Sequence, residues 1–264
     1  MAAAKPILYG AWISSCSHRV RIALNLKGVD YEYKAVNPRT DPDYEKINPI
    51  KYIPALVDGD FVLSDSLAIM LYLEDKYPQH PLVPKDIKTK GLDLQIANIV
   101  CSSIQPLQGY GVIGLHEGRL SPDESLEVVQ RYIDKGFRGF PFLRHSSIIC
   151  DRDMFSCAVL SSDPHQPCLL YVQLTKIILL LVCSYYLLQQ SKSFWMDVTA
   201  NIALEMKSIW GDVCLAPQIH AAINRFQIDM TKYPILSRLH DAYMKIPAFQ
   251  AALPQNQPDA PSAK

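Results

Sequence analysis

The chain has 264 residues, 49% of them hydrophobic, and its 26 basic side chains balance 26 acidic ones, so the formal net charge is zero. This length allows one large domain or two modest ones with a substantial hydrophobic core. Zero net charge offers no electrostatic basis for binding nucleic acid or an anionic membrane surface, so we expect a small-molecule partner.

The number and spacing of the cysteines indicate the redox state of the compartment. The seven cysteines include no Cys-x-x-Cys pair and no cluster with histidine at zinc spacing, and residues 1–6 contain no apolar stretch typical of a secretory signal. We therefore expect reduced thiols, a cytoplasmic location and no metal site.

The chain opens with a predicted strand, helix and second strand. Residues 7–9 are an apolar run, residues 20–24 place apolar side chains at helical spacing before Gly28, and residues 29–36 alternate apolar and charged side chains. Because the helix begins among the serines at 14–17, its unpaired N–H groups and positive dipole end suit an anion or a thiolate. Serine is also a preferred N-cap, so capping alone is the alternative interpretation.

A hairpin and a second helix follow. Two apolar runs, 53–57 and 60–63, flank an Asp-Gly pair, which is a strong hairpin signal. The polar residues 64–66 offer N-caps to a helix that ends before Pro78. The order β-α-β-β-α predicts a compact α/β module over residues 1–84.

From residue 85 onward the pattern predicts helices. Apolar side chains fall at helical spacing over 92–104. Ser121 and Glu124 are spaced as a capping box at the start of a further helix, with a proline at its first position. Two further helices are predicted at 213–226 and 235–253, the second interrupted at Pro247.

Two segments do not fit this helical pattern. The tail, residues 254–264, is rich in Pro, Gln and Ala, and we predict it to be disordered. Residues 139–210 show no capped amphipathic helix and hold four of the seven cysteines. Within them, residues 169–188 are apolar over about the 20 residues a membrane span needs. Lys176 inside this stretch would cost about 2.5–3.5 kcal/mol at a bilayer centre, so we do not expect a span.

Five blocks stand out in order along the chain: residues 14–24, 48–54, 65–69, 104–108 and 216–226. The first reads Ser-Ser-Cys-Ser-His-Arg-Val-Arg-Ile-Ala-Leu. It resembles the active-site signature of the zeta-class glutathione transferases, the maleylacetoacetate isomerases, and the five blocks together resemble that class, most closely its plant members.

The resemblance covers residues 5–138 and 212–258. It implies a thioredoxin-like α/β domain at 1–84, an all-α domain at 85–264, and a homodimer. Residues 139–210 are an atypical insert in that domain, which we interpret as retained intron sequence whose fold is poorly specified.

The resemblance also implies glutathione as cofactor and assigns site residues. Ser14 would donate a hydrogen bond to the thiolate, with Ser15 and Cys16 in supporting catalytic roles, and Arg19 and Arg225 would bind substrate carboxylates. The glutathione-binding positions it implies are Ile53, Pro54, Asp65, Ser66, Gln105, Gly109, Tyr110 and Gly111.

The implied activity is the cis–trans isomerisation of maleylacetoacetate to fumarylacetoacetate in tyrosine and phenylalanine breakdown, with glutathione transfer to small α-haloacids. Two alternatives stay open: a thiol oxidoreductase that uses Cys16, and a non-catalytic product disabled by the insert. Three departures from the family matter. Ile13 stands where the family usually has arginine, the loop at 37–43 is shorter, and Ile209 cannot supply the hydroxyl that caps the following helix, a loss of about 0.5–2 kcal/mol.

Overall fold

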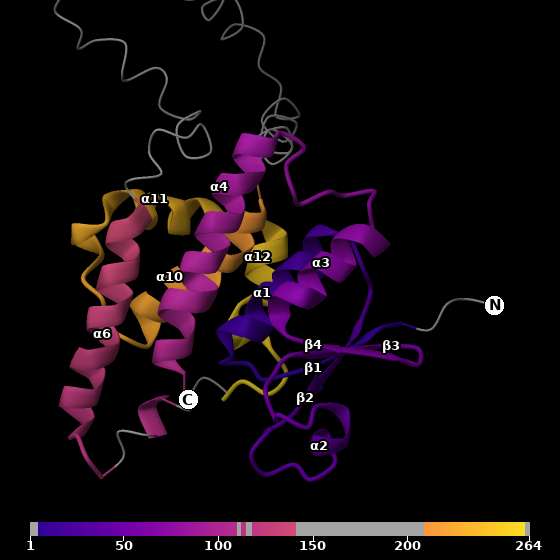
Figure 1. Ribbon diagram of the computed structural model, residues 1–264, viewed down its shortest axis with the longest axis horizontal. Helices are drawn as coiled ribbons and strands as arrows, with labels where there is room; N and C mark the ends of the chain where they lie inside the picture. Colours follow the sequence, from indigo (N-terminus) through magenta and orange to yellow (C-terminus); the bar gives the residue numbers. More distant parts are fainter. Residues whose placement is uncertain (1–4, 110–111, 115–117, 141–208, 262–264) are drawn as a thin grey trace, which may run out of the picture. The chain divides into compact units, whose positions relative to one another are not determined.

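The computed structural model describes residues 5–109, 112–114, 118–140 and 209–261. Its four-stranded sheet has the strand order β2-β1-β3-β4 (Figure 1), in which β1 pairs parallel with β2 and antiparallel with β3. The strands are β1 (Ile7–Gly10), β2 (Glu32–Ala35), β3 (Ala55–Asp58) and β4 (Phe61–Ser64). The parallel pair needs a crossover, and α1 (Ser15–Leu26) supplies it.

Local sequence explains these elements. Gly28, at φ +65°, ends the chain's first helix in a conformation that glycine adopts without steric cost. The hairpin forms as predicted, with Asp58 paired to Phe61 across a two-residue turn. Helix α3 (Ser66–Lys76) follows it, and the one-turn helix α2 (Tyr44–Ile47) lies in a loop for which no helix was predicted. The second strand begins at Glu32, three residues later than predicted.

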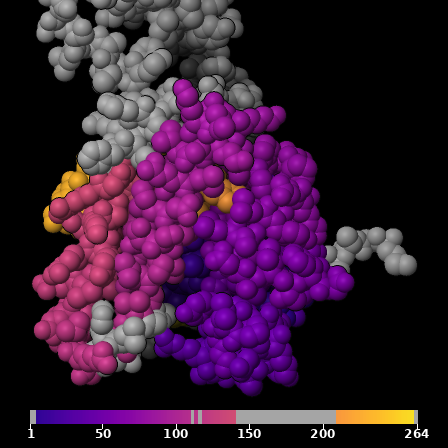
Figure 2. Space-filling view, viewed as in Figure 1, coloured from indigo at the N-terminus to yellow at the C-terminus, as the bar shows by residue number. Residues whose placement is uncertain are grey.

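Helices make up the rest of the described chain, and the apolar face of α10 is the centre of their core. This helix packs against both α1 and α4, and only a small orange area of it is visible between its neighbours in Figure 2. Among the described residues the remaining elements are α4 (Ile87–Asn98), the π-helix η1 (Ile99–Ile104), η2 (Gln105–Gln108), α6 (Pro122–Gly139), α10 (Trp210–Asn224), η5 (Met230–Lys232), α11 (Pro234–Tyr243), α12 (Pro247–Ala252) and η6 (Pro254–Asn256).

Two cap predictions are confirmed. Ser121 accepts from the Glu124 N–H at 3.3 Å, and the Glu124 carboxylate accepts from the Ser121 N–H at 2.7 Å. At the start of α10, Ile209 makes no side-chain cap bond. Tyr243 donates instead to Asp212 in the first turn of this helix, which ties α11 to it.

The predicted disorder of the C-terminal tail is wrong for residues 254–261. Gln257 is buried, and its amide donates to the carbonyls of Ala251 and Leu253 at 3.0 and 2.9 Å. Hydrogen bonds from a polar side chain to backbone groups order the tail. Its low hydrophobicity was therefore a poor indicator of disorder.

Only part of the predicted domain division falls on described residues. Strands occur only before residue 65 in the described chain, and the boundary near residue 84 stays a prediction. The insert at 139–210, apart from its first two and last two residues, lies outside the described residues, as does the apolar stretch 169–188. No helix in the described part of the chain is long and apolar enough to cross a membrane.

Candidate active site

Ser14 is the N-cap of α1 and lies at the carboxyl end of β1. Its backbone is extended, at φ −72° and ψ 115°, and its Oγ accepts a hydrogen bond from the Ser17 N–H at 3.1 Å. This bond uses an oxygen lone pair, so the hydroxyl hydrogen remains able to donate to a ligand. The side chain is half-buried at a helix N-terminus, where the dipole favours a negative charge.

The sheet register brings the other predicted glutathione contacts to the same edge. Ala55, the first residue of β3, lies opposite both Tyr9, one residue before the end of β1, and Ser64 at the end of β4. The segments that continue from these strand ends therefore meet. They carry Ser14 after β1, the cis Ile53-Pro54 peptide before β3, and Asp65-Ser66 after β4.

Asp65 directly follows β4 and is the N-cap of α3. It adopts φ +77°, which is uncommon for a residue with a side chain and is found preferentially at functional sites. Its Oδ1 caps α3 by accepting from the N–H groups of Leu67 and Ala68 at 2.9 and 3.0 Å. Capping uses one carboxylate oxygen and leaves the second available for an amino group.

Arg19 joins this edge to the helical part of the chain. The residue is only 1% exposed, and its Nη1 donates to Ser66 at 3.3 Å and to the sulfur of Cys101 in η1. So deep a position favours holding α1, α3 and η1 together over a direct contact with substrate. The predicted carboxylate-binding role of Arg19 stays a prediction.

Cys16 lies in the first turn of α1, next to Ser15, and both are half-buried. Burial raises the pKa of the Cys16 thiol above its usual value, and the charge of Arg19 only partly opposes that effect. A thiol with a raised pKa is protonated at neutral pH and is a weak nucleophile. This environment disfavours thiol exchange at Cys16.

Gln105 is the first residue of the turn η2 and Gly109 follows its last, and both are half-buried, whereas Tyr110 and Gly111 lie outside the described residues. Sequence reasoning missed the neighbouring Gln108, which is buried and exchanges two hydrogen bonds of 2.9 Å with Gln218 of α10. The only signal was that both glutamines stand in blocks shared with the family.

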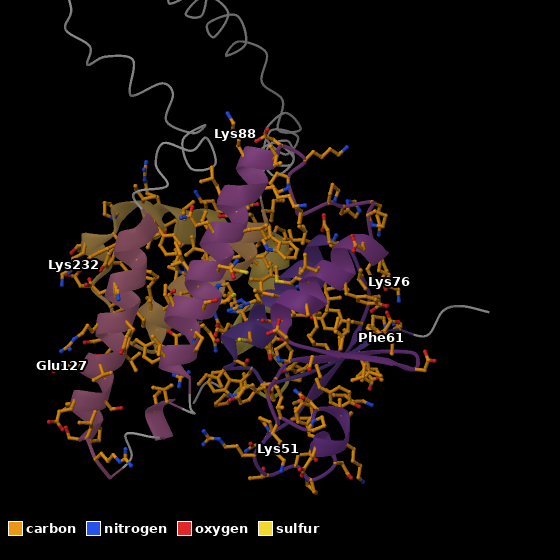
Figure 3. The ribbon with its side chains drawn as sticks, in the orientation of Figure 1. Lys51, Phe61, Lys76, Lys88, Glu127 and Lys232 are labelled. Carbon is orange, nitrogen blue, oxygen red and sulfur yellow. The ribbon has the colours of Figure 1, made fainter. Side chains whose placement is uncertain are left out.

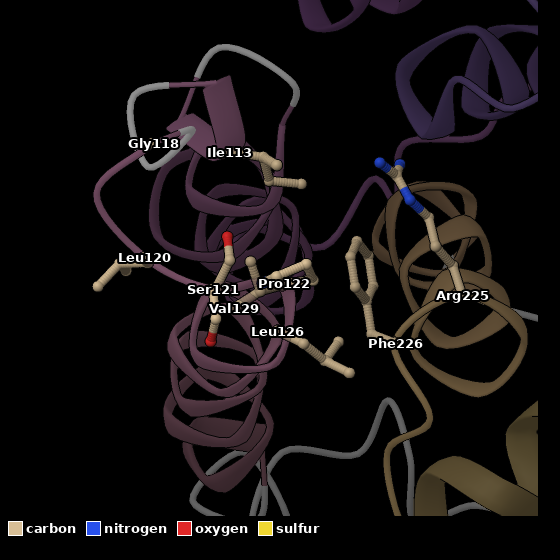
Figure 4. Close-up of a pocket in the computed structure, with 10 residues that line it drawn as sticks. Ile113, Gly118, Leu120, Ser121, Pro122, Leu126, Val129, Arg225 and Phe226 are labelled. Atoms are coloured by element: carbon tan, nitrogen blue, oxygen red, sulfur yellow. The ribbon is translucent and has the colours of Figure 1, made fainter.

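A pocket of about 480 Å³ lies between α6 and the end of α10 (Figure 4). Its walls are mostly apolar, formed by Ile113, Leu126 and Val129, and Arg225 supplies the cationic group. The Arg225 guanidinium lies 4.9 Å from the centre of the Phe226 ring. An apolar pocket with one guanidinium suits a small organic acid. In the described part of the chain no cluster of His, Cys, Asp or Glu could hold a metal ion.

The fold is a thioredoxin-like α/β domain followed by helices. A family model described as "Glutathione S-transferase, N-terminal domain" matches residues 8–81. A glutathione S-transferase of Triticum aestivum is 74% identical over 264 residues, covering all of both chains, so that alignment runs through residues 139–210.

A zeta-class glutathione S-transferase of Euphorbia esula is 43% identical, covering 97% of this chain and 92% of its own. The crystal structure of a maleylacetoacetate isomerase from Anaeromyxobacter dehalogenans, with glutathione bound in its active site, aligns with a TM-score of 0.66. That structure is 26% identical and covers 97% of this chain and 98% of its own. The chain belongs to the zeta-class glutathione transferases, the family of the maleylacetoacetate isomerases.

Proposed function

We propose that the chain is a glutathione-dependent cis–trans isomerase that converts maleylacetoacetate to fumarylacetoacetate in tyrosine and phenylalanine breakdown. The observation that carries this proposal is the position of Ser14, a helix N-cap with a free hydroxyl hydrogen, at the sheet edge shared by Ile53-Pro54 and Asp65-Ser66. A related isomerase holds glutathione in its active site, which supports the same cofactor here.

Bound glutathione supplies a thiolate that adds reversibly to the cis double bond, which lets that bond rotate before the thiolate leaves. Ser14 stabilises the negative sulfur by donating its hydroxyl, assisted by the N–H groups at the start of α1. Lowering a thiol pKa by two units requires about 2.7 kcal/mol. A hydrogen bond to a charged group contributes about 1.5–3 kcal/mol and a helix end about 0.3–1 kcal/mol, so the two together suffice.

The remaining residues bind and orient. The second oxygen of Asp65 and the N–H of Ser66 hold the γ-glutamyl end, the backbone at Ile53 meets the cysteinyl part, and Gln105 faces the cofactor from the helical side. Arg225 binds a carboxylate of the diacid through its two-pronged guanidinium. The same thiolate displaces halide from small α-haloacids, so transferase activity accompanies isomerisation.

The deciding experiment is glutathione-dependent isomerisation of maleylacetone by the full chain and three variants. Ser14→Ala should lower kcat about 100-fold, because it removes the hydroxyl that stabilises the thiolate. Cys16→Ala should retain most of the activity, and Ser14→Thr, which keeps a hydroxyl and a cap, is the matched control. A larger loss in Cys16→Ala than in Ser14→Ala would support the thiol oxidoreductase instead.

A shortened chain tests whether residues 139–210 affect the activity. A chain in which residues 139–210 are replaced by a short linker should isomerise maleylacetone as the full chain does. Activity in the shortened chain alone would mean that the insert disables the product.

We also propose a cytoplasmic homodimer. The free thiols Cys16 and Cys101 suit a reducing compartment. Phe61 on β4 and Leu71 on α3 are 44% and 50% exposed. Phe61 lies beside Lys76 (Figure 3). Exposed apolar faces mark protein contacts, and a second copy of the chain is the occupant that the family suggests. Sedimentation equilibrium of wild type and of Leu71→Glu should give a dimer and a monomer, respectively.

A further inference from the structure

Two segments from opposite ends of the chain meet beside the loop that carries Ser14. Asp259, in the C-terminal tail, accepts a hydrogen bond from the backbone N–H of Trp12 at Oδ2, 2.9 Å away, and a second from the hydroxyl of Tyr33 at Oδ1, 3.1 Å away. Trp12 and Asp259 are 247 residues apart in sequence. Because Trp12 stands two residues before the N-cap serine, the carboxylate holds the backbone that leads into Ser14.

Arg21 holds the same loop from the helix. Its buried guanidinium donates to the carbonyls of Ala11 and Trp12 at 3.4 and 3.3 Å. Its Nε donates at 3.2 Å to the carbonyl of Ala252, the last residue of α12. The Ala11 carbonyl also accepts from the Ser14 N–H at 3.1 Å. The loop is therefore fixed at both its N–H and its C=O groups, and Asp259 supplies the N–H contact at Trp12.

The tail that carries Asp259 is itself anchored. Gln257 bonds to two carbonyls at the end of α12, and the N–H of Ala260 donates to the Gln257 carbonyl at 3.0 Å. Helix α12 is in turn bound to α1, where the Asn25 amide donates to the Ala248 carbonyl at 3.0 Å. The carboxylate of Asp259 thus has a fixed position relative to the helix that Ser14 caps.

We propose that Asp259 is a positioning residue, which sets through the Trp12 N–H where the Ser14 hydroxyl meets the sulfur of bound glutathione. This inference rests on the proposed function. Misplacement of a reacting group by about 1 Å can reduce a rate about 100-fold, so a backbone contact two residues away is close enough to matter. Asp65 and Ser66 bond to α3 and Arg19 and have no hydrogen bond to the tail among the described residues. The tail should therefore control ionisation of the thiol more than binding of the tripeptide.

The experiment measures the pKa of the bound glutathione thiol, by ultraviolet absorbance of the thiolate, together with kcat and the KM for glutathione in the full chain. Asp259→Ala removes both acceptors. We expect it to raise the thiol pKa by about one unit and to lower kcat about tenfold, with the KM for glutathione changed less than about twofold. Asp259→Asn can still accept from Trp12 through its amide oxygen and donate to the Tyr33 oxygen, so it should restore values close to wild type.

Glu127→Ala is the matched control, because this carboxylate is exposed on the outer side of α6 (Figure 3) and should change nothing. If Asp259→Ala does not fold, Asp259→Glu carries the same prediction, since the longer side chain displaces the loop while the charge is kept. A wild-type thiol pKa and kcat in folded Asp259→Ala or Asp259→Glu would overturn the inference. A wild-type chain that binds glutathione without ionising its thiol would overturn the proposed function instead.

Discussion

Gln108 and Gln218 stand 110 residues apart in the chain, and their buried side-chain amides face each other and exchange two hydrogen bonds of 2.9 Å. Each amide satisfies the other, and together they join the turn η2, which begins with Gln105, to the central helix α10. The pair therefore connects the predicted ligand-facing turn to the core.

Breaking this pair on one side should destabilise the fold. Gln108→Leu leaves the Gln218 amide buried without a partner, and we expect the free energy of unfolding to fall by about 1–3 kcal/mol. Gln218→Leu should have a similar effect. The double variant should lose less than the sum of the two, because no unsatisfied amide remains.

Urea denaturation measures all four proteins of this cycle. Gln95→Leu, at an exposed position on the α-helix α4, is the control. Its free energy of unfolding should stay within about 0.5 kcal/mol of wild type. Additive effects of the two core substitutions would show that the amides do not stabilise each other.

Arg225 offers a test of substrate recognition. Arg225→Gln should raise the KM for the acidic substrate maleylacetone about tenfold or more, since a hydrogen bond to a charged group contributes about 1.5–3 kcal/mol. Arg225→Lys keeps the charge and loses the planar fork, so it should recover only part of that affinity. Steady-state kinetics with an uncharged alkyl halide serve as the comparison. An equal rise in KM for the uncharged electrophile would mean that Arg225 shapes the pocket and does not bind the carboxylate.

Local patterns predicted the parts of the fold that depend on neighbours in sequence. The Ser14 cap, the hairpin and the Ser121 capping box each need only three or four residues to specify them. The contacts that complete the site span far greater separations. Gln108 hydrogen-bonds to Gln218, and the tail residue Asp259 hydrogen-bonds to the loop after β1. Such polar contacts produce no periodic pattern of apolar residues, so the sequence gives no sign of them.

Three histidines give the fold a dependence on pH. The rings of His18 and His220 lie 5.8 Å apart, and those of His220 and His240 lie 6.4 Å apart. Burial lowers all three pKa values, and Arg21 adds to the effect at His18; His220 falls to about 4. The folded state therefore binds fewer protons than the unfolded chain, whose histidines titrate near 6.5.

Because the folded state binds fewer protons, acid favours the unfolded state. Stability is full above pH 6.5 and falls as the pH drops from 6.5 toward 4, by at most about 1.4 kcal/mol per pH unit for each histidine. Urea denaturation at several pH values should reveal this slope, and His220→Phe should reduce it. An equal slope in His220→Phe would assign the pH dependence to other groups.

Gly136 of α6 lies directly against Ile104 of the π-helix η1. A Cβ at this position would lie 2.3 Å from the Cδ1 and Cγ1 atoms of Ile104, a fully buried side chain next to Gln105. In an exposed helix Gly→Ala gains about 1 kcal/mol. Here overpacking costs about 1–3 kcal/mol, so Gly136→Ala should lower the melting temperature.

The same helix provides the control for this prediction. At Gly139 a Cβ would lie 3.8 Å from Ile99, an ordinary contact, so Gly139→Ala should be neutral or slightly stabilising. Ile104→Ala removes both the Cδ1 and the Cγ1 atoms, so Gly136→Ala should cost less stability in that background than in the wild type, because the cause of strain is steric. Since Ile104 precedes Gln105, Gly136→Ala should also weaken glutathione binding, measured by titration calorimetry. A variant that is as stable as Gly139→Ala would show that η1 can withdraw from α6 without loss.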